Sequence, residues 1–344
     1  MIESETTPFS RQSSLQRGEH ASQETWSLKL NDPASQRAFW LRFTTLITKN
    51  GFRRISEIWG VLFERDQNRE VLKSALRQTF DISAFKLAPG STVRIGDCEL
   101  SLDMAHGRTR GTIRSKGHAL RWDLQFRGNK PAAFTLTPET LARSGVLKNI
   151  SNTLSEDLRF EGFLVYDDKT IEWKSAPGML THFKGPRSDH SWVWGHANSF
   201  VNERGESVPF IFEGITTRPH AFGAIRLPKL SSFYFLYNGQ EYRFHSLWDS
   251  IRSKSSSTLQ EWEFQADRGE LSFRGKASSE HKDFAGLTFE DTNGSLLYCA
   301  NSKLSDLSLH VYRGGKLDNS FYANGTAALE IVSRERNPYV PLLV

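Results

Sequence analysis

The sequence predicts an all-β protein made of two tandem antiparallel β domains with few short helices. Short runs of alternating apolar and polar residues, rich in aromatic and β-branched side chains, recur along the chain between glycine-containing turns. Helical periodicity is rare. The length of 344 residues exceeds the roughly 250–300 residues that a single core usually organises, which favours two domains.

The composition is that of a folded globular protein. Hydrophobic residues make up 38% and charged residues 24%, while 24 Phe and 9 Trp supply material for a core or an aromatic pocket. The net charge of +5 is mild and the basic residues form no block, so we expect no nucleic-acid partner. Cys98 and Cys299 indicate no disulfide framework and fit a reducing compartment, so we expect a cytoplasmic protein.

The N-terminal residues 1–25 are polar and lack the apolar core of a secretory signal, so they predict a disordered tail. Ordered structure is expected to begin near Trp26. No apolar run approaches the roughly 20 residues that span a bilayer, so we expect no transmembrane segment and at most transient contact with a membrane surface.

The first half reads as strands with two helical candidates. In AFWLRFTTLI, Phe39, Leu41 and Phe43 would share one face of a strand with Trp40 opposite. EGFLVYDDKTIEW predicts a hairpin that turns at 167–169. Residues 66–80 could form one or two helical turns, and 137–147 could form another helix with Thr137 as its N-cap.

In the second half, Asn238-Gly239 is a strong hairpin signal because both residues tolerate positive φ. Paired strands around a turn occur at 110–126 and again at 259–277, which suggests two related β domains. We place the domain boundary in TTRPHAFGA near residue 220, which gives domains at 26–220 and 221–344.

The stretch HFKGPRSDHSWVWGHANSF at 182–200 contains the side chains most suited to catalysis or ligand binding. If its second half is a strand, alternation places four side chains on one face: Trp192, Trp194, His196 and Asn198. Two indoles followed by an imidazole and an amide suit a mostly apolar ligand with one polar or reactive point. The same indoles could instead be core packing.

Such a wall could also assist chemistry on an alkene. Protonation of a carbon–carbon double bond needs an acid, and each tryptophan face stabilises a nearby cation by roughly 0.5–2 kcal/mol. The candidate acids are His182 and Asp189, with His190 and His196 as further donors. A carboxyl kept protonated by an apolar pocket would serve best, although Asp189 in PRSDHS also fits an ordinary turn. A pericyclic reaction would need only a shaped cavity.

Other signals are weaker. The three histidines of the stretch have the spacing H-x7-H-x5-H, which matches no metal-ligand pattern, so we expect no metal. No nucleotide-binding or hydrolase motif occurs, so we expect no cofactor. His245 and Trp248 in RFHSLW could line a cavity of the second domain or its core. Glu213 in FIFEG lies at an edge or is buried with a purpose.

The pattern W-x-W-x-x-x-N-x-F, here Trp192, Trp194, Asn198 and Phe200, follows a turn of small residues. Together with the upstream segment SAPGMLTHFKG, it resembles the lipocalin-like superfamily of tocopherol cyclase and carotenoid 1,2-hydratase (hydroxyneurosporene synthase), and also fungal Diels–Alderases. The order of elements is similar over about 26–330. This resemblance implies a β-sandwich and a lipocalin-like β-barrel, or calycin-type unit, with a cavity for hydrophobic, often isoprenoid, ligands near their interface.

Two hypotheses follow. In the first, the protein is a cofactor-independent cyclase or hydratase, of the isomerase or lyase class, for a terpenoid or polyketide-like substrate. Trp192 and Trp194 would form the wall, His182 or Asp189 the acid, and His196 and Asn198 the polar anchors. In the second, the same cavity belongs to a non-catalytic carrier of a hydrophobic small molecule. A purely structural interaction protein is the third and weakest hypothesis. An enzyme predicts a closed apolar cavity of several hundred Å³ with a perturbed acidic or imidazole group facing inward.

Overall fold

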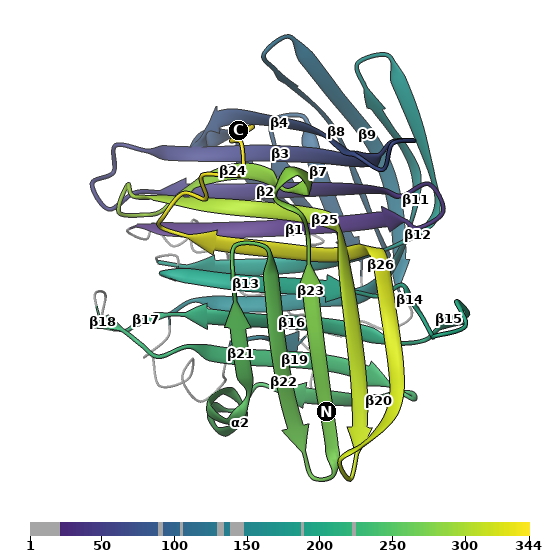
Figure 1. Ribbon diagram of the computed structural model, residues 1–344. Coiled ribbons are helices and arrows are strands. Elements are labelled where there is room, and N and C mark those ends of the chain that lie inside the picture. The colour runs from purple at the N-terminus through teal and green to yellow at the C-terminus, as the bar shows by residue number, and fades with distance from the viewer. Residues whose placement is uncertain are drawn as a thin grey trace, which may run out of the picture.

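The computed structural model describes residues 21–88, 92–103, 106–128, 134–137, 148–186, 189–221 and 225–344. These residues form two large antiparallel sheets and a small two-stranded ribbon (Figure 1). The all-β prediction is confirmed. The chain already enters its first strand at Ser22, earlier than the start expected near Trp26, and the remainder of the predicted tail lies outside the described residues.

The first sheet contains the strands up to Gly185. Its order is β4-β3-β2-β1-β12-β11-β9-β8-β7-β6-β5, with β10 paired to β11. The strands are β1 (Ser22–Asp32), β2 (Arg37–Ile47), β3 (Arg54–Arg65), β4 (Val71–Asp81), β5 (Phe85–Ala88), β6 (Thr92–Ile95), β7 (Cys98–Asp103), β8 (His106–Ser115), β9 (His118–Gly128), β10 (Phe134–Thr135), β11 (Ile150–Tyr166) and β12 (Lys169–Gly185).

The second sheet begins at Ser191. Its order is β20-β19-β16-β13-β26-β25-β23-β22-β21, with β14 paired to both β26 and β15 and with β24 paired to β25. The strands are β13 (Ser191–Ala197), β14 (Phe200–Val201), β15 (Ser207–Val208), β16 (Ile211–Arg218), β19 (Leu230–Tyr237), β20 (Gln240–Phe244), β21 (Lys254–Ser257), β22 (Glu261–Arg268), β23 (Leu271–Ser278), β24 (Ala285–Glu290), β25 (Leu296–Arg313) and β26 (Lys316–Ser333). The separate ribbon pairs β17 (His220–Ala221) with β18 (Ile225–Arg226).

The chain therefore changes sheets between Gly185 and Ser191. The boundary predicted near residue 220 falls at the β17–β18 ribbon instead, after β13 and β16 have already paired in the second sheet. Pro219 separates β16 from β17 at this point, whereas the change of sheet lies earlier, and the division into domains near residue 220 stays a prediction.

Helices are short in the described part of the chain. They are α2 (Leu247–Arg252), η2 (Ile82–Ala84) and η3 (His281–Asp283). The helix predicted within 66–80 is wrong, because most of that segment is β4, which pairs along its whole length with β3. Pairing with a buried neighbour outweighed the helical spacing of Val71, Ala75 and Leu76. Apart from Thr137, the helix predicted at 137–147 lies outside the described residues.

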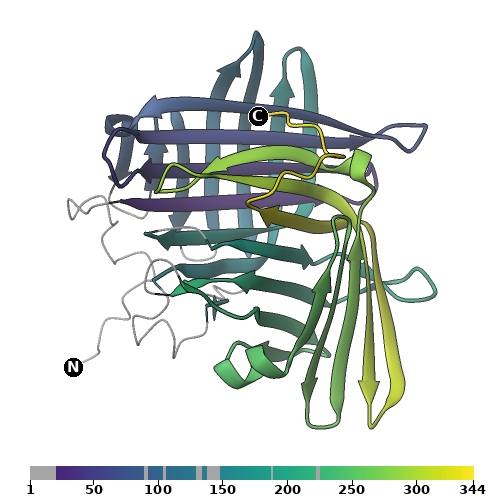
Figure 2. The same cartoon turned by 60° about the vertical axis from the view of Figure 1, so that its left-hand side comes forward.

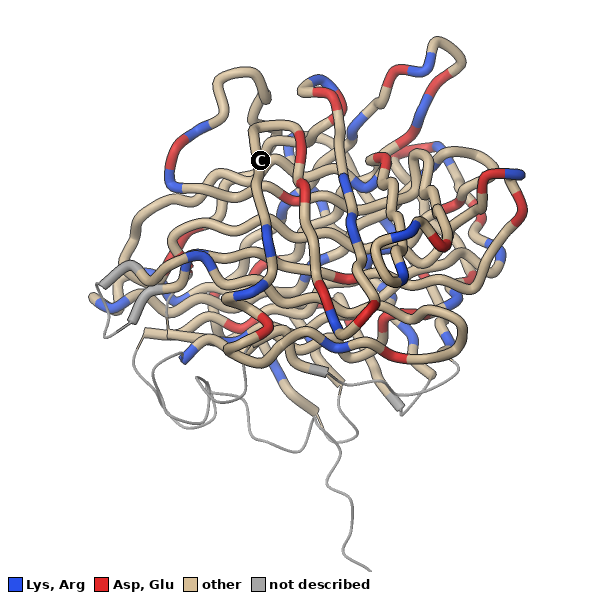
Figure 3. Tube along the Cα trace, turned by 60° about the horizontal axis from the view of Figure 1, so that its bottom comes forward, with Lys and Arg blue, Asp and Glu red and all other residues tan. Residues whose placement is uncertain are grey.

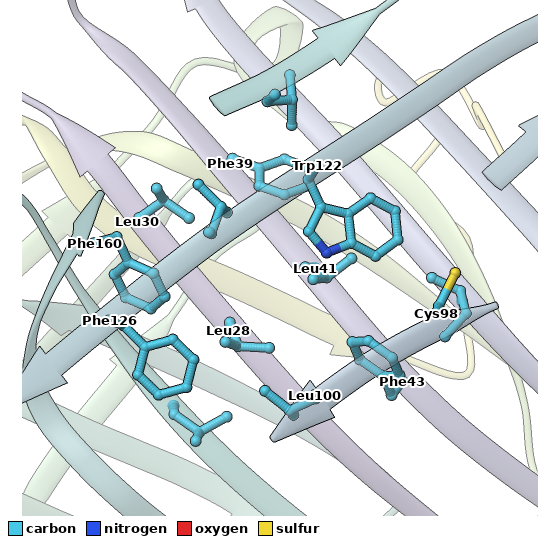
Figure 4. Close-up of a cluster of buried hydrophobic side chains, with 14 of the residues drawn as sticks. Leu28, Leu30, Phe39, Leu41, Phe43, Cys98, Leu100, Trp122, Phe126 and Phe160 are labelled. Atoms are coloured by element: carbon cyan, nitrogen blue, oxygen red, sulfur yellow. The ribbon is translucent and has the colours of Figure 1, made fainter. Parts of the chain in front are cut away.

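The first sheet curls over a core of its own. Phe39, Leu41 and Phe43 of β2 point into this core, whereas Trp40 lies on the other face, as the alternation predicted. Strands β7 to β9 run behind β1 to β4 at a steep angle and cover them (Figure 2). In the close-up of Figure 4, side chains of β1 and β2 meet Trp122 and Phe126 of β9 across this interior.

The second sheet wraps around an aromatic core. Trp262 on β22 is fully buried among phenylalanine rings, with its Nε1–H donating to Ser255 Oγ at 2.9 Å. The space for this indole is left by Gly195 of β13 and Gly214 of β16, which are direct cross-strand partners. A Cβ on either glycine would meet the Trp262 ring within about 3.1 Å.

We expect Gly214→Ala to destabilise the protein by about 1–3 kcal/mol and Gly195→Ala by less, because overpacking a filled core forces rings off their preferred positions. The added carbon in the first variant would lie 2.6 Å from Phe233 Cδ1, whereas the closest contacts in the second are 3.1 Å. Urea denaturation of both variants tests this order. Equal stability of Gly214→Ala and the parent protein would show that the slot is loosely filled.

The two sheets pack face to face. Trp40, Trp59 and Phe63 of the first sheet contact Leu287, Phe289 and other buried residues of β24, β25 and β26. Figure 1 shows the long strands β25 and β26 lying next to β1 at one end and descending into the second sheet at the other. Register shifts in their pairing between Ser302 and Leu307 accompany this change of direction.

Two hairpins predicted from the sequence are present. Asp167 adopts φ of 50° in the turn between β11 and β12. Asn238 and Gly239 adopt φ of 52° and 74° between β19 and β20, as a type I′ turn requires. Basic and acidic positions are interspersed along the described chain (Figure 3). Among the described residues, the helices are all too short and polar to cross a membrane.

Candidate functional site

A pocket of about 180 Å³ lies between the two sheets. Its walls come from β1, β2, β11 and β12 of the first sheet and from β13, β16, β19, β24 and β26 of the second. The volume is below the several hundred Å³ expected for a complete enzyme cavity. It slightly exceeds the roughly 150 Å³ cavity that accommodates benzene, so it can hold one ring-sized apolar group of a ligand.

Aromatic side chains dominate the apolar part of the lining. Trp192 and Trp194 project from β13 into the pocket, together with Trp40, Phe183 and Phe289. The opposite face of β13 carries Val193 and Ala197 into the core of the second sheet. The predicted alternation of β13 therefore holds, and the small residues between the indoles allow the strand to pack closely on its inner side.

Asp189 also lines the pocket, at the turn that precedes β13. Its Oδ1 accepts a hydrogen bond from Asn149 Nδ2 at 2.8 Å, and its Oδ2 accepts one from Thr217 Oγ1 at 2.5 Å. Burial raises the pKa of this carboxyl above its ordinary value, against the lowering effect of both hydrogen bonds, and the Asp291 carboxylate raises it further. Asp189 is thus both a turn residue and an acidic group facing an aromatic pocket.

Glu213 supports the wall from behind. Its side chain is completely buried on β16, where Oε1 accepts from Trp194 Nε1 at 3.0 Å and Oε2 accepts from Thr153 Oγ1 at 2.6 Å. Burial raises the pKa of Glu213 to about 7 despite these bonds. The sequence allowed Glu213 to lie either at a sheet edge or in the interior with a specific role. The structure buries it, and its hydrogen bond orients the indole of Trp194.

The stability of the protein should therefore depend on the charge of Glu213. Between its unfolded pKa of about 4.3 and its folded pKa of about 7, the folded chain binds more protons than the unfolded chain. Stability should then fall as pH rises through this window. We expect Glu213→Gln to gain about 1–3 kcal/mol relative to the parent between about pH 5 and pH 8.

Urea denaturation of both proteins at the two pH values measures this difference. Glu156, whose pKa burial also raises to about 7, is present in both proteins, and its charge raises the pKa of Glu213, so the difference includes the loss of this repulsion. A difference between variant and parent that does not change with pH would mean that Glu213 titrates at the same pH folded and unfolded.

A buried ion pair lies beneath the indoles. Lys303 is fully buried on β25, and its Nζ lies 2.7 Å from Glu330 Oε1 of β26. The same ammonium lies 5.6 Å from the ring centre of Trp40 and 5.4 Å from that of Trp194, within cation–π range of both. Glu330 also lines the pocket. The ion pair therefore joins β25 to β26 next to two aromatic side chains of the pocket, Trp40 and Trp194.

His182, the other predicted acid, does not line the pocket. Thr181 and Phe183 of β12 face the pocket, and His182 between them faces the opposite side of the sheet. There its Nε2 lies 2.9 Å from Glu24 Oε1 and its ring stacks on Trp26 with centroids 4.9 Å apart. Strand alternation therefore separates His182 from Asp189 and from the indoles.

The two predicted anchors lie beyond the pocket on the same face of β13 or just after it. His196 is fully buried, and burial together with nearby Lys29 holds its pKa well below the ordinary value, so the ring is neutral and its Nε2–H donates to the Glu156 carbonyl at 2.9 Å. Asn198 Nδ2 donates to the Gly178 carbonyl at 3.0 Å and to Asp157 Oδ1 at 3.1 Å. These three hydrogen bonds join β13 and the residue just after it to β11 and β12.

His245 and Trp248 are also separate from the pocket. Trp248 lies on α2 with 70% of its surface exposed, and His245 is half-buried just before this helix. A capping box of Ser246 and Asp249 starts the helix. Neither residue lines the pocket between the sheets, and their predicted role in a second-domain cavity stays a prediction.

Sequence reasoning missed several lining residues. Lys29, Arg42 and Trp40 alternate with core residues on β1 and β2, and Glu330 comes from β26. The sequence signal that could have found Lys29 and Arg42 is a basic residue inside an otherwise apolar strand. Such residues are rarely buried unless they bind or pair with another group. Among the described residues, no group of three or more His, Cys, Asp or Glu side chains is arranged to hold a metal ion.

The two sheets with a pocket between them define the lipocalin-like fold that the sequence resembles. The sequence matches no protein-family model and no curated protein. The fold does match solved structures. CghA in complex with Sch210972 is similar with a TM-score of 0.56 at 8% identity, over 91% of this chain and 89% of that chain.

Kievitone hydratase from Nectria haematococca is similar with a TM-score of 0.53 at 9% identity, over 90% of this chain and 88% of that one. The AttH candidate NE1406 from Nitrosomonas europaea is similar with a TM-score of 0.50 at 10% identity, over 91% and 93% of the two chains. At these identities the likeness establishes the shared fold alone, and that fold is one used by a hydratase.

Proposed function

We propose that the protein is a cofactor-independent hydratase or cyclase that acts on a hydrophobic, terpenoid or polyketide-like substrate held in the pocket between the sheets. The observation that carries this proposal is Asp189, a carboxyl whose pKa is raised by burial and which shares the pocket with Trp192 and Trp194. An acid beside cation-stabilising faces is the arrangement that alkene protonation needs. The hydratase among the structural neighbours is consistent with it.

Each group then has a role. Protonated Asp189 gives its proton to one carbon of a substrate double bond, which leaves the positive charge on the other carbon. The indole faces of Trp192 and Trp194 stabilise that charge. In a hydration, a water molecule attacks the cation and then loses a proton to the Asp189 carboxylate. In a cyclisation, a hydroxyl group of the substrate attacks the cation instead and loses its proton to the same carboxylate, which gives an isomer and restores the acid. Thr217 and Asn149 hold the carboxyl in place throughout.

The experiment that tests catalysis is incubation of the protein, in small molar amounts, with a small-molecule extract of the cells that produce it. A hydratase converts a compound to a product heavier by one water, and a cyclase converts it to an isomer, with many turnovers per protein molecule. Mass spectrometry with chromatographic separation detects both results. If every change stays at or below one equivalent of protein, catalysis is contradicted.

The second candidate function is a carrier of a hydrophobic small molecule. It is favoured by the fact that both oxygens of Asp189 already accept hydrogen bonds, which makes the carboxyl a link between Asn149 and β16 as well as a pocket group. In the same experiment, a carrier retains one compound stoichiometrically and changes none. Co-purification of an unaltered lipid with the protein would select this function.

A further inference from the structure

The pocket contains two basic side chains that the proposed chemistry does not use. Lys29 of β1 and Arg42 of β2 both line it. Arg42 is the cross-strand partner of Ser27, and Lys29 is the partner of Trp40, so the two basic residues are diagonal neighbours on the same face of the sheet. Diagonal neighbours lie roughly 7–8 Å apart, which one small anionic group can bridge.

Neither cation is paired within the described structure. Arg42 Nη2 donates to Thr25 Oγ1 at 3.3 Å, while its Nε is buried without a hydrogen-bond partner among the described residues. Lys29 is 2% exposed, and its Nζ donates to Asn31 Oδ1 at 2.9 Å. In the described ranges, no carboxylate lies within ion-pair distance of either side chain. Burial lowers the pKa of both groups, and that of Lys29 well below its ordinary value, so an anion bound beside them would favour their charged forms.

The nearby carboxylates are engaged by other donors. Glu330 accepts from Lys303 at 2.7 Å and from Asn301 at 3.1 Å. Glu57 accepts from Trp59 Nε1 at 3.2 Å and from Thr79 Oγ1 at 2.8 Å. Asp189 is held by Asn149 and Thr217, as described above. Glu330 and Glu57 favour the charged form of Arg42, and Glu213 that of Lys29, only at a distance, so a direct ion-pair partner for either side chain can come from a bound ligand.

The guanidinium is placed at the pocket wall. The Cζ atom of Arg42 lies 4.2 Å from the ring centre of Phe289, which also lines the pocket. Stacking on a ring fixes the plane of the guanidinium and leaves its edge for hydrogen bonding, which suits the planar, two-oxygen geometry of a carboxylate. The aromatic wall formed by Trp192 and Trp194 belongs to the same pocket.

We propose that the ligand is a hydrophobic carboxylic acid, with its carboxylate bound by Arg42 and Lys29 and its apolar body against Trp192 and Trp194. This inference rests on the pocket being the ligand site of the proposed function. It narrows the ligand to amphipathic acids rather than neutral hydrocarbons or alcohols. The recognition is charge-assisted, because both donors are basic groups shielded from water.

The test compares two probes of one ring each, 3-phenylpropionate and 3-phenylpropan-1-ol, which differ in the carboxylate alone. Binding is followed by tryptophan fluorescence, since indoles form the pocket wall. In the parent protein we expect the acid to bind about tenfold or more tightly than the alcohol. In Arg42→Gln we expect the preference to fall below about threefold while the alcohol binds as before.

Arg274→Gln is the matched control, because Arg274 also stacks on a ring, at 4.3 Å from the centre of Tyr312, but lies outside the pocket. It should retain the preference of the parent. Lys29→Met provides a second variant with the same expected loss, in case Arg42→Gln unfolds. Circular dichroism confirms the fold of each protein.

The outcomes separate this inference from the proposed function. Equal affinity of acid and alcohol in the parent protein overturns the acid ligand and leaves the pocket as an apolar site. A preference that persists in both Arg42→Gln and Lys29→Met overturns the assignment of these residues. Failure of both probes to bind contradicts the pocket as a ligand site, and with it both proposals.

Discussion

Replacing Asp189 by asparagine is expected to lower kcat for the substrate by about 100- to 10,000-fold, the usual contribution of a general acid. Asparagine keeps the size of the side chain and an oxygen that accepts from Thr217, but it carries no transferable proton. Asn149 can turn its amide to meet the new NH₂ group. The variant should therefore fold and bind ligand with little change in Kd, so the loss should fall on kcat.

Thr217→Val is the companion variant for Asp189, because it removes one hydrogen bond that lowers the pKa of this carboxyl. The acid is active when protonated, so activity falls as pH rises through its pKa. Without the Thr217 bond the pKa rises, and the alkaline limb of the pH–rate profile should move to higher pH. An unmoved limb, or an Asp189→Asn protein that loses binding and stability in parallel, would leave Asp189 a structural residue only.

Replacing Glu330 by leucine is expected to lower the free energy of unfolding by about 3–5 kcal/mol. The change leaves Lys303, which has no exposed surface, without its carboxylate partner. The contacts of this ammonium with the rings of Trp40 and Trp194 do not replace an ion pair, because each contributes roughly 0.5–2 kcal/mol.

Two further variants make the Glu330 result specific. Lys303→Met combined with Glu330→Leu removes both charges and should recover most of the lost stability. Lys276→Met breaks an exposed pair with Glu261, in which the two side chains are 45% and 42% exposed, and should cost less than about 1 kcal/mol. Chemical denaturation gives all of these values. A loss in Glu330→Leu no greater than that in Lys276→Met would mean that water reaches Lys303.

Much of the fold could be predicted from the sequence because strand alternation is local. The faces of β2 and β13 and the turn at Asn238-Gly239 all follow from period-two patterns and from residues that tolerate positive φ. Segment 66–80 shows the limit of this reasoning. Its apolar residues fit a helix as well as a strand, and pairing with β3, a partner known only in three dimensions, decided the outcome.

The part of the candidate site that lies on β13 could be predicted from the sequence. The part that comes from the other sheet could not, because it reaches the pocket only when the two sheets pack together. The alternation of Trp192 and Trp194 placed both indoles on one face, and Asp189 lies just before them. Arg42 and Lys29 reach the same pocket from strands far earlier in the chain, and no local pattern connects them to β13. No local pattern showed that His182 faces the side of β12 away from the pocket, because the sequence does not say which face of this strand meets the second sheet.

Both proposals depend on the pocket between the two sheets being the ligand site. The most direct test is a crystal structure of the protein soaked with 3-phenylpropan-1-ol, a neutral probe whose binding does not depend on Arg42. We expect the phenyl ring to bind between the sheets, in contact with Trp192 and Trp194 and within reach of Asp189. A pocket closed by the collapse of those indoles, with the probe bound elsewhere or absent, would contradict it.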